Sequence, residues 1–203
     1  MNPGSIFVIF VSIIFIILRF LPKYREPIIV PNVLSEKECE HIKEISKKEL
    51  SASTVSMERE LDNSVRKSKT AWIHKGTDPV VDTIIERCIK MTDKKVENCE
   101  SLQVLKYEPG GFYKPHQDAF DNQKNKRVYT FIIALNDDYE GGETEFPNLN
   151  KTYKLQKGDV LFFHTLNNYN NMTKKALHGG NPVKSGEKWI SNLWIHENKY
   201  MPG

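Results

Sequence analysis

The chain has 203 residues, of which 39 % are hydrophobic and 27 % are charged, and its formal net charge is +3. This length suffices for one domain with a hydrophobic core, or for a domain plus an anchor. The charge is nearly balanced and the basic residues are scattered, so we expect no nucleic-acid partner. The three cysteines lack C-x-x-C spacing and can form at most one disulfide, which excludes a disulfide-rich scaffold.

The N-terminal residues differ from everything that follows. No side chain from Asn2 to Leu18 is charged, and Arg19 is the first basic residue. A bilayer-spanning helix needs about 17–25 apolar residues, so we predict an uncleaved transmembrane signal anchor over residues 1–21. A cleaved signal peptide is the alternative, but it would need basic residues before the apolar run and small residues after it. Residues 22–27 then form a linker, and the folded domain covers residues 28–203.

The next part of the chain predicts a helical layer. Residues 28–34 indicate a short strand, and Ser35 with Glu38 forms a capping box for a helix that runs to about Leu50. Residues 51–70 are polar and predict a mobile loop, which could close over a substrate. Asp78 and Pro79 begin a second helix, whose apolar residues recur at helical spacing.

From Leu102 onward the pattern changes to strands. The segments "LQVLKYEP", "RVYTFIIALND", "KTYKLQKGDVLFFH" and "KWISNLWIHE" are rich in β-branched and aromatic residues. Turn signals rich in Gly, Asn, Asp and Pro separate them. Strands without intervening helices indicate an antiparallel sandwich or barrel. The sequence therefore predicts a mainly β fold with supporting α-helices, in which Trp72 and Trp189 belong to the core.

The stretch "GGFYKPHQDAF", residues 110–120, carries His116 and Asp118 two positions apart. Alternate residues of an extended chain share a face, so an imidazole and a carboxylate would point to one side. With a second, distant histidine they would form the two-histidine, one-carboxylate set of non-haem Fe(II) oxygenases. His178, in a glycine-rich setting, and His164, on a predicted strand, are both suitable. Spacing does not choose between them.

Several motifs in order resemble one family. "LQVLKYEPGGFYKPHQD", "RVYTFIIALND", "GGETEFPN", "KGDVLFF", "ALHGGNPVKSGEKW" and "NLWIH" are similar to the prolyl 4-hydroxylases, and the likeness runs from about Ile28 to Ile195. These enzymes are Fe(II)- and 2-oxoglutarate-dependent dioxygenases. The resemblance implies a double-stranded β-helix, which is a jelly-roll, cupin-like fold.

The resemblance also implies roles for individual residues. His116, Asp118 and His178 match the iron ligands, and Lys188 matches the lysine that binds the distal carboxylate of 2-oxoglutarate. Tyr107 and Thr144 match hydroxyl groups that bind the same cosubstrate. Tyr113, Arg127 and Trp194 match positions that face the peptide substrate. Aromatic rings suit proline, because polyproline II segments dock into aromatic-lined grooves.

The implied activity is hydroxylation of peptidyl proline, in proline-rich or collagen-like sequences, to 4-hydroxyproline. It would consume O₂ and 2-oxoglutarate, release succinate and CO₂, and use L-ascorbate to keep the iron reduced. One alternative is the same chemistry on another substrate, such as peptidyl lysine. Another is a catalytically silent, membrane-tethered binding module, which would predict a broken ligand set.

The resemblance and the charge pattern disagree about compartment. Arg19, Lys23 and Arg25 follow the apolar run, and the positive-inside rule would keep the folded domain in the cytoplasm. Relatives that modify collagen-like chains work in the lumen of the endoplasmic reticulum. We favour a single-pass membrane protein with its domain in that lumen. The sequons at Asn150 and Asn171 would matter only there.

Overall fold

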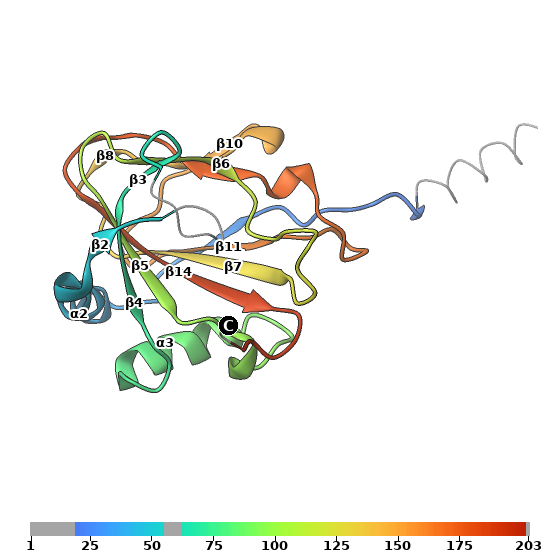
Figure 1. The fold of residues 1–203 in the computed structure, drawn as a ribbon, viewed down its shortest axis with the longest axis horizontal. Helices are drawn as coiled ribbons and strands as arrows, with labels where there is room; N and C mark the ends of the chain where they lie inside the picture. Colours follow the sequence, from blue (N-terminus) through green and yellow to red (C-terminus); the bar gives the residue numbers. More distant parts are fainter. Residues whose placement is uncertain (1–18, 55–61, 202–203) are drawn as a thin grey trace, which may run out of the picture.

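Two antiparallel β-sheets enclose the interior of the protein, in a computed structural model that describes residues 19–54 and 62–201 (Figure 1). The larger sheet contains β1 (Ile28–Val30), β2 (Ser51–Ala52), β4 (Lys69–Ile73), β5 (Leu102–Tyr107), β7 (Arg127–Ala134), β11 (Val160–His164) and β14 (Lys188–His196), in the order β1-β11-β7-β14-β5-β4-β2. The smaller sheet contains β3 (Arg66–Lys67), β6 (Phe112–His116), β9 (Thr144–Phe146), β10 (Lys151–Tyr153) and β12 (His178–Gly180), in the order β10-β9-β12-β6-β3. A short pair, β8 (Glu140–Gly141) with β13 (Val183–Ser185), completes the strands.

Two helices cover the outer face of the larger sheet (Figure 1). Helix α2 (Glu36–Ser46) begins at the predicted capping box, in which Ser35 and Glu38 bond each other's backbone N–H groups, and it continues into the 3₁₀ turn η1 (Lys47–Glu49). Helix α3 (Pro79–Ile89) begins at Asp78, whose carboxylate accepts from two backbone N–H groups of the first turn. Three further 3₁₀ turns are η2 (Val96–Asn98), η3 (Pro147–Leu149) and η4 (Lys174–Ala176). Both predicted helices are confirmed.

Alternation along the strands divides the apolar side chains between two cores. The outer core packs α2 and α3 onto one face of the larger sheet, around residues such as Ile42, Ile84 and Ile133. The inner core lies between the two sheets, where Phe146 of β9 meets Phe163 of β11. The structure is therefore mainly β with supporting helices, as predicted, and it has the two facing sheets of a jelly roll.

The segment from residue 51 to residue 70 is not one loop. It contains β2, β3 and the first residues of β4, and Arg66 of β3 pairs with Tyr113 of β6. The prediction of a single mobile loop was wrong because strands of two residues leave no periodic pattern. Residues 55–61 of the predicted loop lie outside the described residues.

The two tryptophans predicted for the core behave differently. Trp189 is buried, as expected, whereas Trp72 keeps 41 % of its surface exposed. Trp72 alternates with the buried Ala71 and Ile73 along β4, so its side chain points to the opposite face of the sheet from the helices. The prediction for Trp72 was wrong because apolar character alone does not assign a strand residue to a face.

The segment that precedes β1 lies against the folded domain. The Tyr24 hydroxyl donates to the His164 carbonyl at 2.8 Å. The backbones of Lys23 and Asn168 meet as well, since the Asn168 N–H donates to the Lys23 carbonyl at 3.0 Å. Residues 22–27 are thus fixed to the end of β11 and the loop after it.

The predicted membrane anchor is not shown. Its residues 1–18 lie outside the described residues. Within residues 19–54 and 62–201, we find no helix with the length and apolarity that a membrane crossing requires.

Candidate active site

Three side chains, two from strands of the smaller sheet and one from the loop after β6, lie close together. His116 ends β6 and lies directly opposite His178 of β12 in the antiparallel register. Asp118 follows two residues after His116. One nitrogen of each histidine and one oxygen of Asp118 all lie within 4.8 Å of one another. Among the described residues this is the cluster of His, Cys, Asp and Glu side chains that could hold a metal ion.

Gly179 permits this close pairing of β6 and β12. A Cβ atom there would lie 2.9 Å from both the Tyr113 carbonyl oxygen and the Pro115 nitrogen, which is closer than real contacts allow. A larger residue would therefore push the strands apart and separate the two imidazoles. The glycine-rich setting that made His178 a candidate thus has a direct structural reason.

Both histidines are held in the tautomer that a metal requires. The Nδ1 atoms of His116 and His178 lie 3.0 Å from the carbonyl oxygens of Lys114 and Ala176, respectively. A carbonyl only accepts hydrogen bonds, so each Nδ1 carries the proton and each Nε2 presents a lone pair. Each Nε2 lies 3.6 Å from an oxygen of Asp118, beyond hydrogen-bonding distance. The three donor atoms are therefore oriented for an ion rather than for one another.

Burial and charge keep these groups in their metal-binding forms. Burial lowers the pKa of His178 to about 4, although Asp118 opposes this shift. Burial of Asp118 would by itself raise the pKa of its carboxyl, but His178 and His116 hold that pKa below its usual value. The Thr130 hydroxyl donates to Asp118 at 2.7 Å and fixes its second oxygen. A neutral imidazole and an ionised carboxylate are what a divalent cation binds.

His164, the competing histidine, lies elsewhere. It ends β11, and its ring packs edge-on against Tyr129 with centroids 4.9 Å apart. The structure thus brings His178, and not His164, to His116 and Asp118. Spacing in the sequence could not choose between His164 and His178, because each lies at one end of a strand next to a loop.

The residues predicted to bind the cosubstrate lie between the two sheets. Lys188 begins β14 and lies opposite Tyr107 of β5, and its Nζ is 5.4 Å from the Tyr107 ring centroid. Thr144 of β9 is buried and pairs with Gly180, two residues beyond the metal-site histidine. These three residues and the metal cluster therefore lie on the strands that enclose one interior.

The ammonium of Lys188 is buried without an anion. It donates to the Gly142 carbonyl at 2.6 Å, and no acidic side chain in the described part of the chain forms an ion pair with it. Burial, and after it the nearby charge of Lys154, lower the pKa of Lys188 to about 8, although Glu143 opposes this shift. A buried cation of this kind is costly unless a carboxylate or similar anion completes the site. The donor set of this interior therefore fits both Fe(II) and a dicarboxylate.

The structure places the three residues that were predicted to face a peptide on β6, β7 and β14: Tyr113, Arg127 and Trp194. The Tyr113 ring stacks on His116 with centroids 3.7 Å apart. The Arg127 guanidinium lies 3.9 Å from the centroid of a Trp194 ring and also acts on the charge of Asp118. Trp194 pairs across the sheet with Thr130, which holds Asp118. Tyr113 therefore contacts a candidate metal ligand, Arg127 acts on one through its charge, and Trp194 is connected to them only through Arg127 and Thr130.

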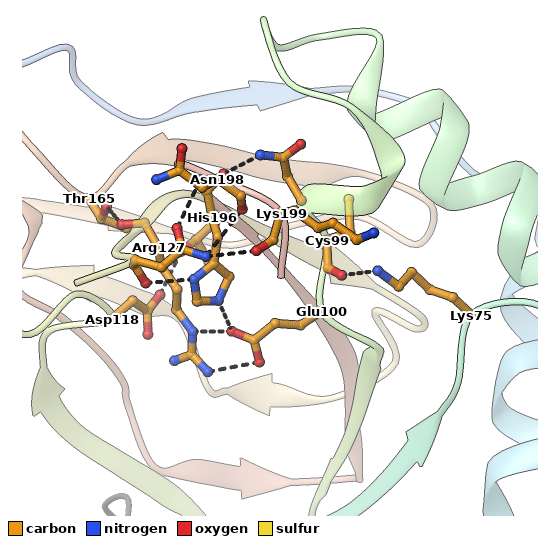
Figure 2. Close-up of polar contacts among 12 residues, drawn as sticks. Lys75, Cys99, Glu100, Asp118, Arg127, Thr165, His196, Asn198 and Lys199 are labelled. Carbon is orange, nitrogen blue, oxygen red and sulfur yellow. Dashed lines mark hydrogen bonds and ion pairs between the residues drawn. The ribbon is translucent and has the colours of Figure 1, made fainter. Parts of the chain in front are cut away.

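Sequence reasoning missed the acid that holds Arg127. Figure 2 shows the Arg127 guanidinium on the buried carboxylate of Glu100, with Nε and Nη2 at 2.5 and 3.0 Å from its two oxygens. His196 Nε2 also lies 2.7 Å from Glu100, and its Nδ1 is 2.8 Å from the Asn125 carbonyl. Both ring nitrogens of His196 thus lie against oxygen atoms of the chain, which fixes the orientation of the ring. Nothing in the sequence pairs Glu100 with Arg127, because the two residues lie far apart in the chain. The one hint to this cluster was that His196 belongs to the family motif "NLWIH".

Comparison with known proteins agrees with this geometry. Residues 102–196 match the sequence model of the 2OG-Fe(II) oxygenase superfamily. The chain is 35 % identical to a putative prolyl 4-hydroxylase of Acanthamoeba polyphaga mimivirus over 87 % of this chain and 76 % of that protein. It is 33 % identical to probable prolyl 4-hydroxylase 3 of Arabidopsis thaliana, over 83 % of this chain and 68 % of that protein.

A solved structure shows the same fold. The viral collagen prolyl hydroxylase of Paramecium Bursaria Chlorella virus-1, solved with 2-oxoglutarate, superposes with a TM-score of 0.71 at 31 % identity, covering 85 % of this chain and 96 % of that one. The fold and the site thus define an Fe(II)- and 2-oxoglutarate-dependent dioxygenase. Within that superfamily, the chain belongs to the prolyl 4-hydroxylase family.

The three ligands should be needed together. We predict that His116→Ala, Asp118→Ala and His178→Ala each abolish turnover and weaken Fe(II) binding, because each removes one donor atom from the cluster. His164→Ala, which leaves the cluster intact, is the matched control and should keep most of the activity. Metal titration followed by 2-oxoglutarate consumption measures both effects. An inactive His164→Ala beside an active His178→Ala would refute the ligand assignment.

Lys188 should act on the cosubstrate and not on the metal. We predict that Lys188→Ala raises the KM for 2-oxoglutarate by at least about a hundredfold, because the buried distal carboxylate loses its cation. The affinity for Fe(II) should change little, since Lys188 is not among the clustered ligands. Steady-state kinetics with varied 2-oxoglutarate and a metal titration separate the two. An unchanged KM would remove Lys188 from the cosubstrate site.

Proposed function

We propose that this protein hydroxylates peptidyl proline, in proline-rich or collagen-like sequences, to 4-hydroxyproline, using O₂ and 2-oxoglutarate and releasing succinate and CO₂. The observation that carries the proposal is the cluster of His116, Asp118 and His178. It lies in the same interior as the buried ammonium of Lys188, whose hydrogen-bond partner in the chain is a carbonyl and not a carboxylate. The family relatives are named prolyl 4-hydroxylases, and the solved neighbour is a collagen prolyl hydroxylase. A silent binding module would have no reason to keep this site intact.

The residues divide the work by position. His116, Asp118 and His178 would hold Fe(II) on one face, and Lys188, Tyr107 and Thr144 would hold 2-oxoglutarate. Together, the metal and the cosubstrate supply the oxidising chemistry that no side chain provides, and ascorbate would keep the iron reduced. The protein's own contribution is orientation and exclusion of water, for which the aromatic rings stacked on both metal-site histidines are suited.

The region around Trp194 supports a peptide substrate. Its indole Nε1 is buried and, among the described residues, has no hydrogen-bond partner. A buried donor left unpaired costs about 1–3 kcal/mol, which a substrate carbonyl would offset. Tyr113 is partly exposed beside the metal cluster, and the rigid ring of proline packs well on aromatic side chains. Arg127, held by Glu100, offers a further donor at the same place.

Proline-rich peptides should stimulate turnover. We predict that peptides with collagen-like or proline-rich repeats increase 2-oxoglutarate consumption, and that mass spectrometry finds the added oxygen on proline. Trp194→Phe, which keeps the ring and removes the N–H, should weaken the peptide response by about tenfold, the cost of one such bond. It should leave 2-oxoglutarate binding nearly unchanged, and Arg127→Ala should behave likewise.

A peptide with every proline replaced by alanine is the control for this assay. Oxygen found on lysine, or equal consumption with the alanine peptide, would favour another substrate for the same chemistry. Trp194→Phe with an unchanged peptide response would remove its indole N–H from the substrate site.

We also propose that the domain lies in the lumen of the endoplasmic reticulum, held by an anchor in residues 1–21. The family resemblance supports this orientation, and the basic residues after the apolar run oppose it. Asn171 of the second sequon is exposed, so a glycosyltransferase could reach it.

Translation with microsomes tests the orientation. We predict a domain protected from added protease, with an endoglycosidase-sensitive band that disappears in Asn171→Gln if that sequon is the one used. Complete digestion of the domain outside intact microsomes would place it in the cytoplasm and overturn the proposal.

A further inference from the structure

A second lysine lies beside the proposed cosubstrate lysine, and neither the sequence motifs nor the proposed function assigns it a role. Lys154 follows β10, and its Nζ donates to the carbonyl oxygens of Tyr139 and Gly141 at 2.9 and 3.1 Å. The same ammonium lies 3.2 Å from the centroid of the Tyr139 ring. Burial lowers the pKa of Lys154, and the surrounding acids, of which Glu143 acts most strongly, oppose that shift. Three contacts thus hold a charged side chain at one turn.

That turn is the one on which Lys188 rests. Gly141 and Gly142 have φ values of +69° and +66°, which favour glycine. Lys154 binds the carbonyl of Gly141, and Lys188 binds the carbonyl of Gly142, the next one along the chain. A Cβ on Gly142 would lie only 3.1 Å from both the Lys188 side chain and the Tyr139 ring. The turn therefore packs directly on both lysines, and its position sets the position of the Lys188 ammonium.

The two lysines also act on each other through their charges. Lys154 is the second cause, after burial, of the lowered pKa of Lys188. Glu143, beside the turn, opposes that effect. Asp137 and Glu140 also act on Lys154 through their charges, and Tyr107 and Tyr139 contact the two lysines through their rings. The Lys188 ammonium thus lies in the field of a second cation, which Glu143 offsets only in part.

We propose that Lys154 is a positioning residue for the dicarboxylate cosubstrate: it fixes the Gly141–Gly142 turn that carries Lys188, and it supplies a second positive charge at the end of the interior where the distal carboxylate binds. The inference rests on the proposed role of Lys188. Lys154 acts through the turn and through its field, and does not itself touch the cosubstrate.

Removing the Lys154 charge should change the binding of 2-oxoglutarate in two ways, one in its alkaline limit and one in its strength at neutral pH. Lys188 binds a carboxylate only while it is charged, so affinity is lost as pH rises through its pKa of about 8. Without the charge of Lys154, the pKa of Lys188 rises, and the loss of affinity moves to higher pH. At neutral pH the same change weakens binding, because one positive charge and the support of the turn are gone. A lysine that only supported the turn would weaken binding at neutral pH and leave the alkaline loss of affinity at the same pH.

The test is calorimetric titration of 2-oxoglutarate into the full-length protein loaded with Mn(II), which supports binding without turnover. We expect Lys154→Met to weaken binding about tenfold near pH 7 and to shift the alkaline loss of affinity upward by about half a pH unit or more. Lys154→Arg keeps the charge and the donors, and should restore both properties. Lys151→Met is the matched control, because Lys151 lies on the adjacent β10 and pairs only with Glu26 in the described chain.

Two results would overturn the proposal. One is a Lys154→Met protein that binds like Lys151→Met at every pH. The other is weakened binding with an unmoved alkaline limit, which would leave Lys154 a structural residue only. Lys188→Ala is measured beside them: unchanged affinity in that variant would show that the proposed cosubstrate site itself is wrong, whatever Lys154 does.

Discussion

The direct opposition of His116 and His178 across β6 and β12 is the constraint on which the rest of the site depends. Antiparallel pairing places two residues at a fixed separation without any loop contributing, and Gly179 lets the two backbones approach closely enough. Asp118 then needs only to follow the end of β6 by two residues. Thr130 holds Asp118 from the larger sheet, so the metal cluster also ties the two sheets together.

Two polar groups in this interior are buried without a fitting partner in the chain, at a cost to the free protein. Lys188 has a carbonyl for a partner where a carboxylate would be better, and Trp194 has a donor with no acceptor. By contrast, Glu100 is completed by Arg127 and His196 within the chain. The unmet groups mark where small molecules and substrate would bind, whereas the completed group marks a support that positions Arg127.

The sequence predicted the parts of the fold that local chemistry decides. Ser35 with Glu38, and Asp78 with Pro79, identify helix starts because caps have few alternatives. The long strands followed from alternation and composition. The candidate iron ligands were selected by the family motifs, since spacing alone left His164 and His178 equivalent, and the structure brings the selected residues together. Those motifs also suggested Lys188, but not its neighbour Lys154, whose role depends on a turn between distant strands.

What could not be predicted depends on pairing across the fold. Strands β2 and β3 are too short to show a period, and their place comes from partners in β4 and β6. Trp72 was assigned to the wrong environment because its apolar character does not reveal which face of β4 it lies on. Glu100 meets Arg127 and His196 only because β5, β14 and β7 are neighbours in one sheet.

The attachment of residues 22–27 to the domain limits how freely the domain can move relative to the chain that precedes it. Tyr24 is bonded to the end of β11, and Lys23 is paired with Asn168, so the segment cannot swing as a flexible leash would. Under the proposed membrane attachment through residues 1–21, the domain would be joined to the anchor at one defined point on its surface, beside the end of β11. Its orientation relative to that anchor would then be set by these contacts and not by a flexible linker.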